Sequence, residues 1–289
     1  MKERIYNTAW GLGVRVRNAV KRVGILGPVE PLLSKMAPIL IHPPRNEFEI
    51  TLPWGMKMEM PAGYPAGRSY AAGVYESSVT CFFREFLRDG MTVVDVGANI
   101  GYYSLLASNI VGMSGKIYAF EPDPTNYAYL LKNIEVNSCF NVFDIQKAVY
   151  NKTGTNTFIR DTKGTEGFLT TGRKSDYAIV VQTITLDDFF AQIMWPNVDF
   201  IKIDIEGSEF AALEGMRELI QRNPRIQIVM EYNMANLHRS GVTRDALITI
   251  LQELGFHKGY VIERGMKPFR IVSELPRSHA TYDMLFKKD

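Results

Sequence analysis

Four charged residues lie near the ends of two apolar segments, where their types and spacing could move a proton. Lys202, Asp204 and Glu206 alternate with isoleucines in the segment 198–206, and Glu231 follows a second apolar run. Side chains of a strand alternate between its faces, so the first three share one face. Charges there cost several kcal/mol per ion, as an order of magnitude, unless they are paired or hydrated. Carboxylates in such a place can draw the proton from a hydroxyl and make its oxygen a nucleophile.

We therefore take Lys202, Asp204, Glu206 and Glu231 as the candidate catalytic residues, and alternatives stay open for them. Lys202 and one acid could form a buried ion pair that only holds the sheet. The three carboxylates could hold a divalent cation that positions two substrate oxygens. Nothing in their spacing demands a metal, so no metal site is predicted. His238 is a further candidate base, although a lone histidine in a loop is usually just solvated.

Residues 92–104 could bind the polar end of a nucleotide. The β-branched run from Val93 to Val96 predicts a buried strand, and residues 102–110 have the apolar spacing of a helix. Gly97 and Gly101 between them predict a sharp turn that a ligand can approach closely. A strand, a glycine turn and a helix in this order form the nucleotide-binding corner of a doubly wound α/β sheet.

The acids beside this turn distinguish between two kinds of nucleotide. A dinucleotide fold prefers the pattern G-x-G-x-x-G, and here Asn99 replaces the middle glycine. Asp95 would repel a pyrophosphate but suits a ligand that carries an ammonium and a sulfonium. Glu121 ends a second strand, where a carboxylate grips a ribose diol. The two acids favour S-adenosylmethionine over NAD, and a nicotinamide-dependent oxidoreductase is the alternative.

The rest of the chain alternates between helices and strands, as in an α/β sheet with its active site at the carboxyl ends of the strands. Helices are predicted at 77–87, 123–137 and 247–254, and strands at 116–120, 142–149, 226–233 and 256–262. The segment 151–180 is too long for a plain turn, and its flanks 155–159 and 179–184 predict an extra antiparallel pair. Residues 161–176 are expected to form a lid or substrate loop, or else only a hairpin tip.

The sequence predicts an N-terminal extension, 1–73, before a main domain, 74–289. Residues 1–26 are basic and amphipathic, typical of a helix that packs with a solvated face or lies on an anionic membrane. A proline-rich connector follows, then a β-hairpin at 48–60 and a loop at 64–73. Tyr75 and Glu76 are expected to close over the methionine end of the cofactor, with a helix-start carboxylate as the alternative.

The composition is that of an ordinary globular protein and limits the choice of partners. Of 289 residues, 46% are hydrophobic and 22% are charged, and the net charge of +2 argues against a protein that coats nucleic acid. Cys81 and Cys139 form neither a metal-binding spacing nor a disulfide framework, so a reducing, cytoplasmic compartment is expected. No run is long enough to span a bilayer, and no secretory signal is visible.

Four motifs, in this order and spacing, resemble the FkbM family of S-adenosylmethionine-dependent methyltransferases. They are VDVGANIG at 94–101, FEP at 120–122, TLDD at 185–188 and KIDIEGSE at 202–209. The resemblance covers roughly residues 74–286. It implies a class I methyltransferase fold, which is α/β and Rossmann-like, with a seven-stranded, mostly parallel sheet whose last strand, 282–287, runs antiparallel. Members commonly O-methylate sugars, polyketides or other small hydroxylated compounds.

The resemblance also implies where the cofactor lies. The glycine turn falls at its methionine side, Glu121 at its ribose, and the Lys-x-Asp-x-Glu-Gly motif beside the transferring methyl. The expected cofactor-binding residues are Tyr75, Glu76, Asp95, Gly97, Ala98, Asn99, Gly101, Ser104, Glu121, Pro122, Ala148 and Asp204. The predicted function is O-methylation of a hydroxyl on a small molecule, a sugar or glycan, or a lipid-linked acceptor. Besides the oxidoreductase, a non-catalytic, membrane-associated binding module is the alternative.

Overall fold

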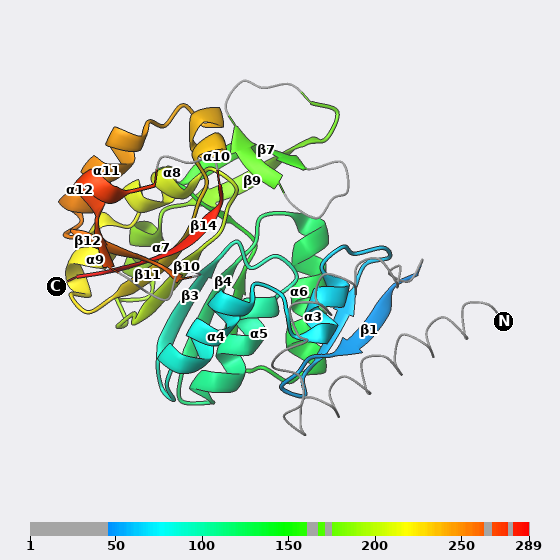
Figure 1. Ribbon diagram of the computed structural model, residues 1–289. Helices are drawn as coiled ribbons and strands as arrows, with labels where there is room; N and C mark the ends of the chain where they lie inside the picture. Colours follow the sequence, from blue (N-terminus) through cyan, green and yellow to red (C-terminus); the bar gives the residue numbers. More distant parts are fainter. Residues whose placement is uncertain (1–45, 161–166, 171–174, 263–267, 277–279, 289) are drawn as a thin grey trace.

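An eight-stranded sheet forms the centre of the computed structural model, which describes residues 46–160, 167–170, 175–262, 268–276 and 280–288. The strands follow one another in space as β13-β12-β14-β11-β10-β3-β4-β5 (Figure 1). Their bounds are β3 (Thr92–Val96), β4 (Lys116–Phe120), β5 (Val142–Ile145), β10 (Phe200–Ile203), β11 (Gln227–Tyr232), β12 (Lys258–Val261), β13 (Pro268–Arg270) and β14 (Tyr282–Lys287).

This sheet confirms the expected topology and adds one strand to it. Strands β5, β4, β3, β10 and β11 are parallel neighbours, and β14 lies antiparallel between β11 and β12. These seven strands are the expected sheet, and β13 is an eighth, which pairs antiparallel with the outer edge of β12. Its three residues lie in the proline-containing connection before the last strand, where the sequence shows no strand pattern, and they cover part of an open sheet edge.

Helices cover both faces of the sheet, because the central strands are apolar on both sides (Figure 1). On one face, Val93 and Phe200 pack with apolar side chains of α4 (Ser77–Phe86), α5 (Tyr102–Val111) and α6 (Pro124–Val136). On the other, Val94 and Ile201 pack with those of α7 (Leu186–Gln192), α8 (Glu209–Glu214), α9 (Arg217–Arg222), α11 (Arg244–Glu253) and α12 (Ile271–Glu274). Parallel register sets Lys202 of β10 opposite Asp95 of β3, so two charged residues lie side by side on the central strands.

A second, four-stranded sheet lies beside the carboxyl edge of the first. Its order is β6 (Ala148–Val149), β9 (Ala178–Ile184), β7 (Gly154–Arg160) and β8 (Gly167–Thr170). The expected antiparallel pair is confirmed as β7 and β9. The single strand expected at 142–149 is wrong, because the chain leaves the central sheet after Ile145 and β6 pairs with β9 instead.

The lid expected at 161–176 is described only in part. Residues 167–170 form strand β8, which pairs with β7. Residues 161–166 and 171–174 lie outside the described residues, as do the basic helix and the proline-rich connector expected before residue 46. In the part of the chain that is described, no helix is long and apolar enough to cross a membrane.

The expected N-terminal hairpin is present and packs on the main sheet's helix layer. Strands β1 (Phe48–Thr51) and β2 (Lys57–Met60) pair antiparallel. Asn133 and Asn137 of α6 hydrogen-bond to the backbone of β2. The loop expected at 64–73 is wrong in part, because α3 (Gly67–Ala72) forms there. Its buried Tyr70 and Ala71 join the same apolar core, so tertiary packing outweighs the loop-like composition.

Candidate functional site

A cavity opens at the carboxyl ends of the central strands, as expected for a doubly wound sheet. It encloses about 1030 Å³, including space open to solvent. Most of the predicted site residues line it: Tyr75, Glu76, Asp95, Gly97, Ala98, Asn99, Glu121, Pro122, Ala148, Asp204, Glu206 and Glu231. Among the predicted residues, Gly101, Ser104 and Lys202 do not line it and lie behind those that do.

The glycine turn after β3 is shaped by close backbone packing. Gly97 has φ +85°, and a Cβ there would lie closer than 3.0 Å to the carbonyl oxygen of Asp204, a separation that real Cβ atoms essentially never show. Asn99 also has positive φ, at 51°, and its backbone N–H donates to Glu121 Oε2 at 2.9 Å. The turn therefore joins the ends of β3, β4 and β10 into one wall of the cavity.

Asp95 presents an unsatisfied acceptor to this cavity. Its side chain is buried, Oδ2 accepts a hydrogen bond from Ser104 Oγ at 2.6 Å, and Oδ1 has no partner among the described residues. Burial raises the pKa of Asp95, while Lys202 and Ser104 oppose that shift. A buried acceptor without a partner is costly, so Oδ1 fits a ligand that brings a donor, such as the methionine ammonium of S-adenosylmethionine.

Glu121 is held rigidly at the end of β4. Its Oε2 accepts from the Asn99 N–H and its Oε1 from the Asp123 N–H at 2.8 Å. Burial raises the pKa of Glu121 to about 8, although these two backbone donors oppose the shift. A fixed carboxyl group at this place fits the ribose diol of an adenosine moiety.

Lys202 reaches the cavity only through Asp204. Its ammonium lies 2.9 Å from Asp204 Oδ2 and 4.8 Å from the ring centroid of Tyr103. Burial lowers the pKa of Lys202, but the carboxylates of Asp204, Asp95 and Glu76 outweigh burial and raise it. This geometry agrees with the ion-pair alternative, in which Lys202 neutralises and orients Asp204.

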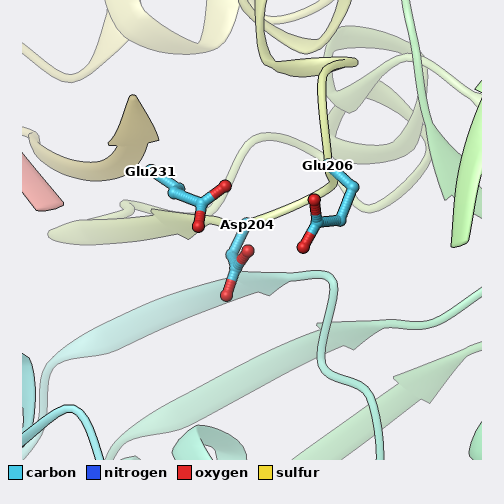
Figure 2. A group of neighbouring side chains, drawn as sticks. All are labelled: Asp204, Glu206 and Glu231. Atoms are coloured by element: carbon cyan, nitrogen blue, oxygen red, sulfur yellow. The ribbon is translucent and has the colours of Figure 1, made fainter. Parts of the chain in front are cut away.

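Three carboxylates that line the cavity converge on one another (Figure 2). One oxygen from each of Asp204, Glu206 and Glu231 lies within 4.8 Å of the other two. Glu206 comes from the turn after β10, with φ 55°, and Glu231 comes from the end of β11. Burial, followed by the charges of Asp204 and Glu206, raises the pKa of Glu231 to about 9. At neutral pH the cluster therefore holds a proton, and it favours ligands that bring hydrogen-bond donors or positive charge.

Three tyrosines that were not predicted as site residues form part of the cavity wall. Tyr70, Tyr102 and Tyr103 line the cavity beside Tyr75, and the Tyr103 hydroxyl donates to Glu76 Oε2 at 2.7 Å. Burial raises the pKa of Tyr103 and of Glu76. Tyr102 and Tyr103 follow the recognised glycine turn directly, which is the signal that could have identified them. Tyr70 lies in the segment expected to be a loop.

The small sheet supplies another unpredicted part of the wall. Phe158, Gly167 and Leu169 of β7 and β8 line the cavity. Arg160 of β7 forms an ion pair with Asp123, the residue that caps helix α6. This pair fixes the small sheet next to Glu121. Alternation of apolar residues predicted β7, but no motif indicated that it faces the cofactor site.

Comparisons with known proteins place the chain in a family. The family described as Methyltransferase FkbM domain matches residues 95–258, which is more than half of the chain. The hexuronic acid methyltransferase AglP of Haloferax volcanii is 25% identical over 127 residues, which make up 44% of this chain and 50% of that protein. The chain thus spans about half the length of this curated relative.

Two solved structures are similar to part of the chain. An FkbM methyltransferase from Methylobacillus flagellatus KT is 20% identical, with a TM-score of 0.45, and the match covers 75% of this chain and 52% of that one. A Streptococcus mutans protein solved in complex with SAH is 11% identical, with a TM-score of 0.43, and the match covers 74% and 97%.

The fold, the acid-lined cavity and the family match define a class I methyltransferase whose methyl donor is S-adenosylmethionine. The chain belongs to the FkbM methyltransferase family. The predicted class of enzyme is confirmed, and the nicotinamide-dependent alternative is set aside.

Proposed function

We propose that the enzyme methylates a hydroxyl group of a neutral, sugar-like acceptor. The observation that supports this proposal is the cluster of carboxylates from Asp204, Glu206 and Glu231 that lines the cavity. An alcohol is a weak nucleophile until its proton is drawn away, and a positioned base contributes about 10²–10⁴-fold to the rate. The cluster provides both an ionised carboxylate to accept that proton and further oxygens to bind neighbouring hydroxyls.

On the donor side, the buried acids would bind S-adenosylmethionine and orient it. Asp95 would accept from the methionine ammonium, Glu121 would hold the ribose diol, and Pro122 and Ala148 would border the adenine. When bound, S-adenosylmethionine would supply a methyl group attached to a sulfonium. The rest of the donor is then a neutral thioether, a leaving group that needs no acid. The protein's contribution is to hold the acceptor oxygen in line with that methyl group, because alignment itself supplies much of the rate.

On the acceptor side, a carboxylate of the cluster would take the hydroxyl proton as the acceptor oxygen bonds to the donor's methyl carbon and the thioether leaves. Glu206 is our candidate for this base, because Glu231 already holds a proton at neutral pH and Asp204 is paired with Lys202. Asp204 would accept a hydrogen bond from an adjacent hydroxyl. Lys202 would keep Asp204 in its orientation from below the cavity.

The charge of the cavity supports a neutral acceptor. Six carboxyl groups line it, and Lys147 is the one basic side chain among the described residues that do so. The carboxyl groups are those of Glu76, Asp95, Glu121, Asp204, Glu206 and Glu231. The pKa values of Glu121 and Glu231 lie above neutral pH, but the other carboxylates still attract a positively charged methyl donor and repel an anionic acceptor. The name of the Haloferax relative supports a sugar acceptor, and the cavity's charge favours a hydroxyl over a carboxylate as the reacting group.

A matched pair of sugars tests this proposal. The enzyme is incubated with methyl-labelled donor and either methyl glucoside or its uronate counterpart, which differ in one carboxylate. We expect an alkali-stable methyl ether on the neutral sugar and little product on the uronate. Glu206→Gln should lower transfer by about 10²–10⁴-fold while retaining S-adenosylhomocysteine binding. Glu253→Gln, an exposed carboxyl change outside the cavity, is the control. An alkali-labile ester, or preference for the uronate, would contradict the proposal.

A further inference from the structure

Helix α10 (Met234–Arg239) directs two side chains at Glu206, although it lies outside the recognised motifs. Asn236 Nδ2 donates to Glu206 Oε2 at 2.9 Å, and Arg239 Nη2 donates to the backbone carbonyl of Glu206 at 2.5 Å. Residues three apart in a helix share a face. One face of α10 therefore binds the carboxylate and the backbone of the same residue.

The turn that carries Glu206 depends on such support. Glu206 has φ 55°, a left-handed conformation that side chains other than glycine and asparagine rarely adopt. Gly207 follows with φ +109°, and a Cβ there would lie 2.8 Å from the carbonyl oxygen of Asn236. The turn thus packs directly on α10, and strained backbone of this kind persists only where its surroundings hold it.

Asn236 is itself well anchored. Its side chain is buried, and the Asn233 cap at the start of α10 accepts a hydrogen bond from its backbone N–H. Strand β11, which carries Glu231, leads directly into this helix. The same strand and helix therefore place both Glu231 and the groups that hold Glu206.

Arg239 also connects this helix to the small sheet. Its guanidinium carbon lies 4.1 Å from the ring centroid of Phe168 in β8, between two residues that line the cavity. The planar guanidinium can stack on an aromatic ring and donate to a carbonyl at the same time. Arg239 thus links the Glu206 turn to strand β8, which forms part of the cavity wall.

We propose that Asn236 and Arg239 are positioning residues, which hold the Glu206 carboxylate toward the reacting methyl group. The inference rests on the proposed function in assigning Glu206 to the reacting centre. Neither residue need touch either substrate. Asn236 would fix the direction of the carboxylate, and Arg239 would fix the turn from which it projects.

A binding experiment that needs no acceptor tests this inference. S-adenosylmethionine carries a sulfonium and S-adenosylhomocysteine a neutral thioether, so the ratio of their affinities reports the negative charge near the sulfur. Titration calorimetry of the full chain should show that Glu206→Gln lowers the preference for the sulfonium by about three- to tenfold. Asn236→Ala and Arg239→Ala should lower it in the same direction. Asn236→Ala should add nothing in the Glu206→Gln background, because it acts through that carboxylate.

Two further variants separate positioning from folding. Asn236→Leu keeps nearly the volume of the buried side chain but donates no hydrogen bond, and it should lower the ratio as Asn236→Ala does. Asn151→Ala removes an asparagine–carboxylate bond of the same kind, to Glu214 outside the cavity, and should leave the ratio unchanged.

The outcomes are distinct from those of the sugar test. An unchanged ratio in Glu206→Gln or in both Asn236 variants would overturn the inference. An equal loss of both affinities, or additive effects in the double variant, would do so too. The binding experiment contains no acceptor, so it does not depend on hydroxyl methylation. If the sugar test failed, the proposed function would be refuted, and the affinity ratios would still decide whether Asn236 and Arg239 position Glu206.

Discussion

At the scale of single residues, the environment of Glu231 makes stability depend on pH. Its pKa is about 9 in the folded protein and 4.5 for an ordinary glutamate, so folding takes up a proton between these values. Stability supplied by this group is therefore present below pH 4.5 and is lost as the pH rises toward 9. We expect Glu231→Gln to be more stable than the parent by roughly 1–3 kcal/mol at pH 8 and nearly equal at pH 4.5.

Urea unfolding across this pH range measures the effect. The difference in unfolding free energy between Glu231→Gln and the parent should grow with pH. Glu85→Gln, at an exposed position of α4, is the control and should show no such growth. A difference that stays constant with pH would show that the carboxyl group of Glu231 is ionised in the folded protein at neutral pH.

Single site residues can be predicted from the sequence where a charged residue stands in or beside an apolar strand. Asp95, Glu121 and Glu206 could be placed at the cavity because an acid beside an apolar strand is costly unless a ligand, a partner or water meets it. Tyr70 could not, because a tyrosine in a glycine-rich segment is equally at home on the surface. Asn236 was not predictable for a related reason, since its contact with Glu206 joins a helix to a turn that is distant in sequence.

At the scale of elements, the ion pair between Arg160 and Asp123 joins the small sheet to helix α6. The Asp123 carboxylate is buried and also caps α6. Arg160→Leu would leave this buried charge without its cation, so we expect a loss of about 1–3 kcal/mol in unfolding free energy. Affinity for S-adenosylhomocysteine should fall several-fold, because the Asp123 N–H donates to Glu121 Oε1.

Asp123→Asn provides the matched background for this prediction. Asparagine is as good a helix cap as aspartate, and it carries no charge that needs Arg160. In this background Arg160→Leu should cost little, and the difference between the two backgrounds gives the coupling energy of the pair. Equal losses in both backgrounds, measured by urea unfolding, would show that Arg160 acts through packing and not through its charge.

Helices and strands were predictable where apolar residues recur with a single helical or alternating spacing along the whole segment. Helices α5 and α6 and strands β7 and β9 follow their patterns closely. The error at 142–149 arose because periodicity shows a strand but not which sheet it joins. Helix α3 and strand β8 form where the local composition favours loops. Packing of α3 against the hairpin, and pairing of β8 with β7, provide the stabilisation that the intrinsic propensities of their residues do not.

At the scale of the whole molecule, parallel strands bring distant acids to one edge. Asp95, Glu121 and Glu206 lie in three separate segments, yet each lies in or just after the last residues of a strand of the same sheet. The order β5-β4-β3-β10-β11 then makes them neighbours. The alternation of helices and strands predicted only that they lie at the carboxyl edge of one sheet. The added strand β13 and the place of the small sheet were not predictable, because both depend on which open edge a short segment meets.

The hairpin β1–β2 tests how far this unit extends. Sequence alone suggests a boundary at residue 73, but Ile50, Leu52, Met58 and Met60 are buried in the same core as helices α5 and α6. Four such side chains contribute roughly 6–12 kcal/mol as an upper estimate, comparable to the about 5–15 kcal/mol by which a domain is stable. We expect a chain beginning at residue 74 to lose cooperative thermal unfolding and S-adenosylhomocysteine binding.

A chain beginning at residue 46 is the control, because it keeps the hairpin and every described residue that packs against it. It should unfold cooperatively and bind S-adenosylhomocysteine with an affinity close to that of the full chain. If the chain beginning at residue 74 did the same, the hairpin would be an appendage and residue 73 the true boundary. The expected result instead makes β1 and β2 part of the methyltransferase domain, because their buried side chains complete the core behind the glycine turn.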